Sequence, residues 1–494
     1  MKDRLALPIA MLLSSTILAA PPTFSTKRLV NTPINGLLPF DVKTEDIDRD
    51  GDLDVYTANY SGRIAWYENA GGNPPGPWLE HVLTDFADGA EAAVAIRVDG
   101  DADVDFLSAA FNLEEIAWYS NESDAVTWTK EPITFECRLC TDVTSADLDG
   151  DGDNDAISAS GFDGKIAWYE NTGSFNLFWV PRVVSPAAAE CVEAADLDQD
   201  GDLDVVAGLS WHESDGASPP AFKEHLLVAP PAYVANAIAI LDVDRDGDLD
   251  VLSASQESDR VDWYENSGGL PPRWTPRAVS TTTDFATGVY AADLDGDADM
   301  DVLSASFFDN TIAWYENDGG SPPAWTKRAI STTAMGARSV FAADLEGDGD
   351  IDVLSASQSD ARVVWHVNES DYSDADGDGM RDELDCASGD GTAFLVPREV
   401  SGARFRSRTG LDWNGAVAGS GSGALYDVVR GRLSQPGTAE TCLANGVAPR
   451  TLIDDTNPDP GTGFYYLIRA SNACGTGSFG GRSSGVPRPS GACT

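Results

Sequence analysis

An acidic nonapeptide recurs seven times along this chain at a nearly constant interval. The first copy, DIDRDGDLD, begins at Asp46. The other copies follow at intervals of 46 to 51 residues and begin at Arg97, Asp147, Asp196, Asp242, Asp293 and Asp344. A fixed internal period of this length indicates a repeat architecture in which each repeat is one supersecondary unit. Because one such unit cannot bury its apolar face alone, we expect neighbouring repeats to pack against one another.

Four strand signals follow one another within each period. The acidic run leads into a strand such as DVLSAS (301–306), and an alternating strand such as TIAWYEN (311–317) comes next. A third strand such as AWTKRAI (324–330) and a fourth such as SVFAADL (339–345) complete the period. Four strands separated by turn signals are typical of a propeller blade, whereas the coils of a parallel β-helix are usually much shorter. The sequence therefore predicts an all-β chain with a seven-bladed β-propeller over residues 22–368.

Tryptophan supports the register of the repeats. One position is filled in all seven copies, by Trp66, Trp118, Trp168, Trp211, Trp263, Trp314 and Trp365. A second position is filled by Trp78, Trp128, Trp179, Trp274 and Trp325, with Phe24 and Phe222 completing the set. A large aromatic residue that recurs in every copy favours packing between blades over stacking on a carbohydrate.

The sequence repeat does not begin and end at the boundaries of a blade. The array opens with TFSTKRLV (23–30), which matches the strand AWTKRAI, and it ends at RVVWHVN (362–368). Residues 24–30 are therefore expected to supply the fourth strand of the seventh blade. This arrangement closes the ring and hides both edge strands, which a secreted all-β protein must protect from pairing with its neighbours.

The first twenty residues resemble an export signal. Lys2 and Arg4 precede an apolar stretch from Leu5 to Ala20 that ends in small residues. A transmembrane anchor is the alternative, but the stretch is short and contains proline, serine and threonine. We predict a signal peptide over residues 1–20 and a secreted, extracellular mature protein. The seven cysteines of the chain agree with an oxidising compartment.

The carboxylates of each acidic run are placed as ligands for a hard cation. In DLDGDGDND (147–155) they stand at positions 1, 3, 5, 7 and 9, with Gly152 at position 6, where the chain must turn sharply. Calcium takes oxygen ligands, and a tight loop supplies them from side chains at positions 1, 3 and 5, a backbone carbonyl at 7 and a carboxylate at 9. Without a cation, neighbouring carboxylates repel by about 1 kcal/mol per pair even in water. A solvated acidic loop would explain the negative charge but not the placement of the carboxylates at every second position.

These loops, followed by strands such as DVLSAS, make the chain resemble the FG-GAP/VCBS repeat family, whose repeats also occur in integrin α subunits. The resemblance covers residues 22–368 and rests on the pattern D-x-D-x-D-G-x-x-D. It implies a propeller that binds calcium in the loop between the first and second strands of a blade. The implied ligands are Asp46, Asp48, Asp50, Asp52 and Asp54; Asp147, Asp149, Asp151, Asp153 and Asp155; Asp196, Asp198, Asp200, Asp202 and Asp204; Asp242, Asp244, Asp246, Asp248 and Asp250; Asp293, Asp295, Asp297, Asp299 and Asp301; and Asp344, Glu346, Asp348, Asp350 and Asp352.

Two repeats depart from this pattern. The second has Arg97 at position 1 and Ala102 at position 6, and the sixth has Ala298 at position 6. The fixed positive charge of Arg97 is expected to replace the ion by pairing with a carboxylate of its own loop, at Asp99, Asp101 or Asp105. We therefore expect an empty second loop. An alanine in a left-handed turn costs about 1 kcal/mol, so the sixth loop is expected to bind calcium more weakly than the other five.

A further calcium signal follows the propeller. The segment DADGDGMRDELDC (374–386) resembles a thrombospondin type-3 or EF-hand-like loop, with Gly379 at position 6. Its implied ligands are Asp374, Asp376, Asp378, Asp382 and Asp385. We assign residues 369–391 to a calcium-binding linker, although a flexible acidic linker is the alternative. Residues 392–494 resemble a small fibronectin type III β-sandwich, with candidate strands at 411–413, 426–431 and 464–480.

No catalytic motif stands out in the sequence, and we do not predict an enzyme. No two of the four histidines have the spacing of a zinc motif, and His212 and His366 occupy the tyrosine position of the WYEN strand. Cys137 and Cys140 form a C-x-x-C without a second pair, which in an exported protein favours a local disulfide, or one to Cys191. The many carboxylates leave glycosidase chemistry open, because an acid pair is defined by its separation in space.

The leading interpretation is an extracellular binding or adhesion module. With 32 basic against 81 acidic residues the net charge is −49, which disfavours nucleic acid and membrane surfaces as partners and leaves an extracellular glycan or protein. Loops on the face opposite the acidic loops carry aromatic residues beside amides and carboxylates, which suits sugar stacking as in lectins built on this repeat. These candidate ligand-binding residues are Tyr60, Phe111, Phe162, Phe307 and Phe308. Packing of these rings onto blade edges, a carbohydrate-active enzyme and a purely structural surface protein are the alternatives.

Overall fold

The computed structural model describes residues 21–369, except for 30–36, 72–77, 102, 122–124, 126, 163, 174–178, 229–233 and 270. It also describes the backbone of seven strands between residues 404 and 476. The predicted signal peptide (1–20) and the predicted calcium loop at 374–385 lie outside the described residues. Within the described part, no helix is long and apolar enough to cross a membrane.

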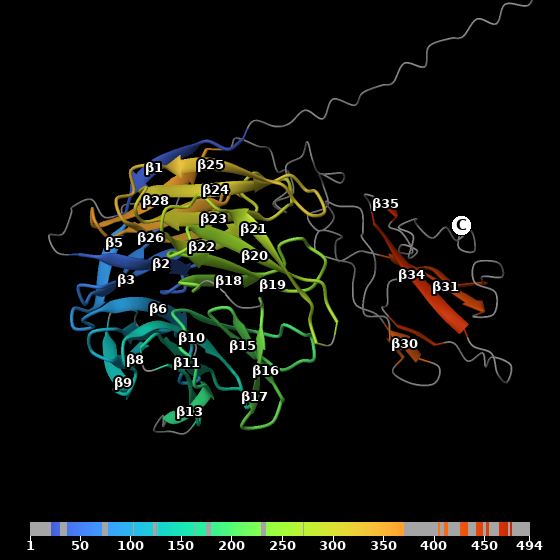
Figure 1. Ribbon diagram of the computed structural model, residues 1–494, viewed down its shortest axis with the longest axis horizontal. Coiled ribbons are helices and arrows are strands. Elements are labelled where there is room, and N and C mark those ends of the chain that lie inside the picture. Colours follow the sequence, from blue (N-terminus) through green and yellow to red (C-terminus); the bar gives the residue numbers. More distant parts are fainter. Residues whose placement is uncertain are drawn as a thin grey trace, which may run out of the picture.

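Seven four-stranded antiparallel sheets form the blades of a propeller (Figure 1). Blade 1 consists of β2 (Pro39–Glu45), β3 (Asp54–Asn59), β4 (Ile64–Glu68) and β5 (Leu79–Thr84). Blade 2 consists of β6 (Ala90–Ile96), β7 (Asp105–Ala110), β8 (Glu115–Asn121) and β9 (Trp128–Thr134). Blade 3 consists of β10 (Cys140–Ala146), β11 (Asp155–Ser160), β12 (Lys165–Asn171) and β13 (Trp179–Ser185). Blade 4 consists of β14 (Val192–Ala195), β15 (Asp204–Ala207), β16 (Ser210–Ser214) and β17 (Phe222–Leu226).

The remaining three blades repeat the same up-and-down order. Blade 5 consists of β18 (Ala237–Leu241), β19 (Asp250–Ser255), β20 (Arg260–Asn266) and β21 (Trp274–Ser280). Blade 6 consists of β22 (Ala286–Ala292), β23 (Asp301–Ser306), β24 (Thr311–Asn317) and β25 (Trp325–Ser331). Blade 7 consists of β26 (Ala337–Ala343), β27 (Asp352–Ser357), β28 (Arg362–Asn368) and, from the start of the chain, β1 (Phe24–Arg28). The all-β, seven-bladed architecture predicted from the repeat is confirmed.

The ring closes in the predicted way. β1 pairs antiparallel with β28 over five residues, from Phe24 opposite Asn368 to Arg28 opposite Val364. Figure 1 shows β1, in blue, beside the orange strands at the end of the propeller. The ammonium of Lys27 lies 4.2 Å from the centre of the Trp365 ring, and Leu29 is buried in the same cluster. The first and last segments of the propeller therefore share one blade.

The second strand of a blade is its most deeply buried element. Every residue of β3, β7, β11, β19, β23 and β27 is buried, because each of these strands packs against the neighbouring blades as well as its own sheet. The seven repeated tryptophans are also buried. Trp365 of blade 7 contacts Trp78 of blade 1, and Trp263 of blade 5 contacts Trp325 of blade 6. The predicted packing role of these aromatic residues is confirmed.

The histidines and cysteines take the places expected of them. His212 and His366 are buried strand residues, and His366 Nε2 lies 2.9 Å from Ser355 Oγ, where other blades pair a tyrosine hydroxyl with a serine. Cys137 and Cys140 form a local disulfide. Cys191, the other partner considered from the sequence, is a buried free thiol.

The C-terminal strands form two sheets. One joins β29 (Arg404–Phe405), β30 (Gly410–Asp412) and β33 (Thr451–Ile453). The other joins β32 (Thr441–Val447), β31 (Leu425–Arg432), β34 (Phe464–Asn472) and β35 (Gly475–Thr476) in that order. Two antiparallel sheets are compatible with a β-sandwich, and the specific resemblance to fibronectin type III stays a prediction.

Candidate functional site

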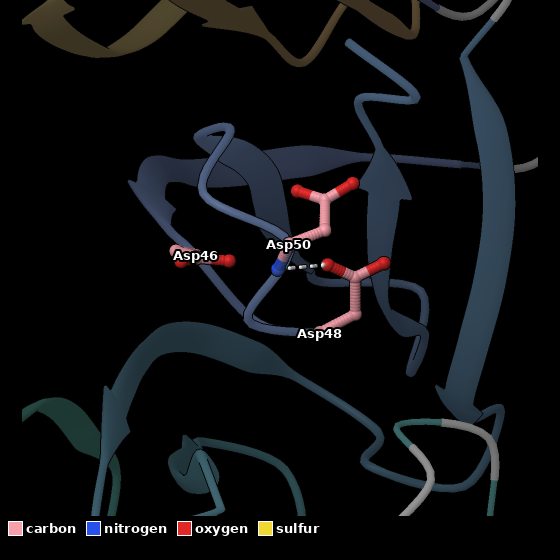
Figure 2. A group of neighbouring side chains, drawn as sticks. All are labelled: Asp46, Asp48 and Asp50. Atoms are coloured by element: carbon pink, nitrogen blue, oxygen red, sulfur yellow. Dashed lines mark hydrogen bonds between the residues drawn. The ribbon is translucent and has the colours of Figure 1, made fainter.

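The acidic loops join the first and second strands of each blade, and their carboxylates gather on one side of a tight turn. Figure 2 shows Asp46, Asp48 and Asp50 of blade 1, where Asp48 Oδ1 accepts the backbone N–H of Asp50 at 3.1 Å. In five loops, one oxygen from each of three carboxylates lies within 4.8 Å of the other two. These triplets are Asp46, Asp48 and Asp50; Asp147, Asp149 and Asp155; Asp196, Asp198 and Asp204; Asp242, Asp244 and Asp246; and Asp293, Asp295 and Asp297.

The carboxylate at position 1 organises the turn. Asp147 accepts the backbone N–H of Asp151 with Oδ1 at 3.1 Å and that of Gly152 with Oδ2 at 3.0 Å. The same pair of bonds recurs from Asp196, Asp242, Asp293 and Asp344. Each bond uses one lone pair of an oxygen and leaves another for a metal ion. The loop is thus held in shape by backbone amides before any ion binds.

The carboxylate at position 9 is buried in all seven blades. Asp155 accepts the N–H of Leu148 with Oδ2 at 3.1 Å and the N–H of Asn171 with Oδ1 at 2.7 Å. Equivalent bonds occur at Asp54, Asp105, Asp204, Asp250, Asp301 and Asp352. Burial raises the pKa of Asp155 to about 7, because desolvation outweighs these amide bonds. A cation beside the carboxylate would reverse that penalty.

Two buried carboxylate oxygens give a further reason to place a divalent cation in the loops. Asp46 Oδ1 and Asp149 Oδ1 are buried, and neither has a hydrogen-bond partner in the described part of the chain. An orphaned anionic oxygen that is shielded from water is costly, and an ion would satisfy it. Oxygen-only donors in a flexible loop suit calcium. The assignment of particular ligands, including the position-7 carbonyls, stays a prediction.

The six loops whose position 6 is described have two left-handed positions, at 4 and 6, and the sequence pattern indicated only position 6. Position 6 has φ of 99° at Gly152 and 69° at Ala298, so the alanine of loop six bears the expected backbone strain. Position 4 is also left-handed in every loop, and it holds Arg49, Gln199 or Arg245 in three of them. These long side chains reach the next loop, and Gln199 Nε2 donates to the Gly247 carbonyl at 2.7 Å.

Loop two differs from the others. Arg97 forms an ion pair with Glu45 of blade 1, at 3.8 Å between Nη2 and Oε1. We expected Arg97 to pair with a carboxylate of its own loop. The ion pair with Glu45 connects loop two to blade 1. Val98 N–H still donates to the position-9 carboxylate of Asp105 at 3.0 Å, which shows that the frame of the loop is kept. Ala102 lies outside the described residues, and the empty second loop stays a prediction.

An asparagine at the end of the third strand ties neighbouring loops together. Asn171 Nδ2 donates to the carbonyl of Asn154 in its own loop and to the carbonyl of Val98 in the loop of the preceding blade. Asn69 does the same across the closure, with a 3.0 Å bond to the Leu345 carbonyl of blade 7. The sequence reasoning missed this role, although the final letter of WYEN in successive repeats was its signal.

The opposite face of the propeller, which we call the mouth face, carries two sets of loops. They are the loops between the second and third strands of a blade and the loops between consecutive blades, and they contact each other, for example through the Ala87 N–H and the Gly62 carbonyl. Phe162 and Phe308 are 61% and 59% exposed there. Phe86 and Phe135, in loops between blades, are exposed as well and were not anticipated.

The other predicted ligand-binding residues are half-buried. Tyr60 stacks on Phe40 at 5.0 Å between ring centres and lies 6.1 Å from Phe111. Phe307 lies 5.3 Å from Phe308, and the Arg338 guanidinium covers both Phe40 and Phe307 at 4.3 and 4.6 Å. The predicted set therefore divides in two. Phe162 and Phe308 are exposed, whereas Tyr60, Phe111 and Phe307, together with Phe40, form a group that we call the aromatic arc.

The arc borders a cavity of about 970 Å³ on the propeller axis, lined by the innermost strands. Five of these strands have a β-bulge near the mouth face. In β6, for example, the pairing with β7 shifts between Ala90 and Ala92. The residues skipped in the pairing are Phe40, Glu91, Thr141, Thr287 and Arg338, and all of them line the cavity. A bulge re-aims a side chain, so the extra residue of each strand faces the opening.

Charged groups from several blades also line this cavity. Asp41 and Lys43 come from blade 1, Asp142 from blade 3 and Glu193 from blade 4. Lys43 Nζ lies 3.6 Å from Asp41 Oδ2, and the two carboxylates opposite raise the pKa of Lys43 further. Burial raises the pKa of Asp142 to about 7, and Lys43 opposes that shift. Sequence reasoning missed this cluster, whose signal was charged residues within otherwise small-residue strands, as in FDVKTED and ECVEAAD.

Comparison with known proteins agrees with this geometry. A family model described as the FG-GAP-like repeat matches residues 46–108, 147–207, 242–304 and 299–355, which together contain all seven acidic loops. A search of curated proteins gives no match.

Solved structures also match the chain. Two of them are titled as crystal structures of BBS1N in complex with ARL6DN, one soaked with lead and one with mercury. They share 12% and 11% sequence identity with this chain at TM-scores of 0.46 and 0.43, and each comparison covers 71% of this chain and 99% of the other.

The matches to the repeat model, the seven acidic loops and the closed ring of blades lead to one conclusion: this chain carries FG-GAP-like repeats that form a seven-bladed β-propeller.

Proposed function

We propose that the protein is a secreted, calcium-binding module that binds an extracellular glycan at its mouth face. The observation that carries the proposal is the combination of exposed aromatic rings with a polar cavity on that face. Phe162 and Phe308 are largely exposed to solvent, and the carboxylates and amides of the cavity lie beside the arc. Aromatic stacking with a few convergent polar groups is the chemistry that recognises a sugar.

Calcium would act on the opposite face as a structural ion. It would supply positive charge to the carboxylates of each loop and offset both their mutual repulsion and the cost of burying the position-9 aspartate. Asn69 and Asn171 bind carbonyls in the loop of the preceding blade. A stiffer loop would therefore also hold its neighbour, and the seven blades would present the mouth face as one rigid surface.

A glycan array on the purified full-length chain tests the proposal. Specific binding that survives washing in calcium and is lost after the mouth face is altered would support it. Failure to bind any saccharide, with the propeller folded and calcium present, would overturn the glycan assignment and favour a protein ligand.

Carbohydrate hydrolysis is the second candidate, because the cavity places Glu91, Asp142 and Glu190 on neighbouring blades. Burial raises the pKa of Glu91 to about 8, which suits a general acid. The same array experiment separates the two functions. Release of shortened product from a bound oligosaccharide would indicate an enzyme, and retention of intact ligand would indicate a binding module.

Restoring the missing carboxylate of loop two should create a calcium site. We expect Arg97→Asp to bind one more calcium ion per chain than the natural protein, because the frame held by Asp105 is already present. Isothermal titration calorimetry on metal-free protein counts the ions. Arg97→Ala is the control, since it removes the same positive charge without adding a ligand. An equal gain in both variants would mean that charge alone, and not the position-1 ligand, decides occupancy.

Truncating an exposed ring should weaken ligand binding without unfolding the protein. We expect Phe308→Ala to lower affinity for an array-positive glycan about fivefold, since a stacked ring contributes on the order of 1 kcal/mol. The melting temperature should stay nearly constant because Phe308 is largely exposed. Leu226→Ala, at a comparably exposed position on the outer strand β17, should leave affinity unchanged. A large loss of stability would show that Phe308 is a packing residue.

A further inference from the structure

Two carboxylates at the mouth of the cavity have no partner of their own. Glu91 is the bulged residue of β6, and Glu190 lies two residues before β14. Both line the cavity, and within the described residues neither makes a hydrogen bond or an ion pair. Burial raises the pKa of both groups, and Glu190 and Asp142 add to the shift of Glu91 while Arg338 opposes it. Two carboxyl groups without a partner among the described residues therefore line one partly dry cavity.

The other charged groups of the cavity are already engaged. Asp142 accepts the backbone N–H groups of Val143 and Val192, both at 2.9 Å. Glu193 Oε2 accepts from Thr144 Oγ1 at 3.3 Å. Arg338 donates to Gln358 Oε1 at 2.8 Å and lies against the aromatic arc. Within the described residues, the carboxyl groups of the cavity that lack such partners are thus Glu91 and Glu190, at its mouth, and a bound cation would hold them ionised.

The neighbourhood of Glu190 connects this charge to an exposed ring. A Cβ atom on Gly161 would lie 2.2 Å from Glu190 Oε1, so the carboxylate sits directly over that glycine. Gly161 precedes Phe162, one of the two exposed rings of the predicted set, which Arg138 contacts at 4.9 Å. Between Glu91 and Glu190 in blade order comes Thr141, whose Oγ1 is buried and finds no hydrogen-bond partner among the residues that the structure describes. A hydroxyl acceptor, two carboxylates and an aromatic ring therefore come from three consecutive blades.

From this arrangement we infer that the mouth face selects saccharides that carry a protonated amino group, with Glu91 and Glu190 as the groups that bind the ammonium. The inference rests on the proposed glycan-binding function and specifies its ligand class. An ammonium offers three donors and one positive charge. It can pair with a carboxylate and hold it ionised, and Thr141 Oγ1 is a further acceptor. A neutral sugar would leave both carboxylates unpaired in the bound complex, where water is excluded. The net charge of −49 also attracts a cationic saccharide from a distance.

Three tetrasaccharides with the same β-1,4 linkage test the inference on the full chain. Glucosamine, N-acetylglucosamine and glucose tetramers differ only at carbon 2, which carries an ammonium, an acetamide or a hydroxyl. In calorimetric titrations at about pH 6, where the weakly basic amine of glucosamine is largely protonated, we expect the glucosamine tetramer to bind at least about tenfold more tightly than the glucose tetramer. The double variant Glu91→Gln/Glu190→Gln should abolish that preference and keep the weaker binding of the glucose tetramer.

The control separates local recognition from overall charge. Glu136 is an exposed carboxylate on the same face, in the loop between β9 and β10, and Glu136→Gln removes a negative charge outside the cavity. The preference should persist in this variant. A preference that survives the double variant, or that Glu136→Gln also abolishes, would overturn the assignment to Glu91 and Glu190. Equal binding of the three tetramers would overturn the inference and leave the glycan-binding function standing, whereas binding of no saccharide would remove both.

Discussion

Adding millimolar calcium to the metal-free protein should raise its melting temperature by at least about 15 °C. An ion that binds only the folded state stabilises it by about 2.7 kcal/mol when its concentration is one hundred times Kd. Five loops bring three carboxylate oxygens within 4.8 Å of one another, so the effect is multiplied. Differential scanning calorimetry in EDTA and in calcium measures the shift.

The rise in melting temperature caused by calcium should also grow with pH. Burial raises the folded-state pKa of Asp250 to about 8 and that of Asp204 to about 6, above the ordinary value of 3.8 that applies in the unfolded chain. Between about pH 4 and pH 8 the folded protein therefore holds more protons than the unfolded chain, and its metal-free stability falls as pH rises. Calcium binds the ionised carboxylates and competes with those protons. The calcium-dependent shift should be smallest near pH 5 and largest near pH 8.

Magnesium and a single-loop variant serve as controls for this prediction. Magnesium prefers a rigid octahedral site and keeps its waters, so it should give a much smaller shift at the same concentration. Asp147→Ala removes one position-1 ligand and should lower the calcium increment by roughly the contribution of one site. Identical melting temperatures in EDTA and calcium, or an increment that shrinks as pH rises, would contradict the calcium assignment.

The repeat made the architecture predictable because it fixes many weak signals at once. A single DVLSAS strand or one WYEN segment indicates little, but seven copies in register define the blades, the acidic loops and the phase of the closure. The strand TFSTKRLV matched AWTKRAI closely enough to place β1 in blade 7 although it lies more than 330 residues from β28 in sequence. Repetition thus replaced the long-range information that a single sequence normally lacks.

The cavity was not predictable in the same way, because it depends on what differs between repeats. Glu91 and Arg338 face the cavity since each is the extra residue of a β-bulge, and the sequence pattern does not show which residue of the strand is skipped. Arg97 illustrates the same limit: its charge predicted a partner in its own loop but did not predict the ion pair with Glu45, which crosses to the neighbouring blade. Contacts between blades depend on ring geometry, which the period alone does not define.

Removing β1 should open the ring and lower the melting temperature of the propeller by about 10 °C. Deleting residues 24–28 removes five antiparallel pairs with β28 and the cation–π contact between Lys27 and Trp365. It also removes Phe24, which packs against the core between blades 6 and 7. A loss of about 4 to 6 kcal/mol is expected from one strand and its apolar contacts, and each kcal/mol changes the melting temperature by about 2 °C in a protein of this size.

The deletion also leaves β28 as an unpaired edge, and this gives the prediction a second readout. An exposed edge strand pairs with other chains, so the variant should aggregate at concentrations at which the natural protein is monodisperse. A synthetic peptide of residues 22–30 should restore both the melting temperature and the solubility by adding to β28 as a strand. A peptide with the same composition in scrambled order should restore neither. If the deletion left the melting temperature and the solubility unchanged, the contacts between neighbouring blades, such as the Asn69 bond to the Leu345 carbonyl, would hold the ring closed without its shared strand.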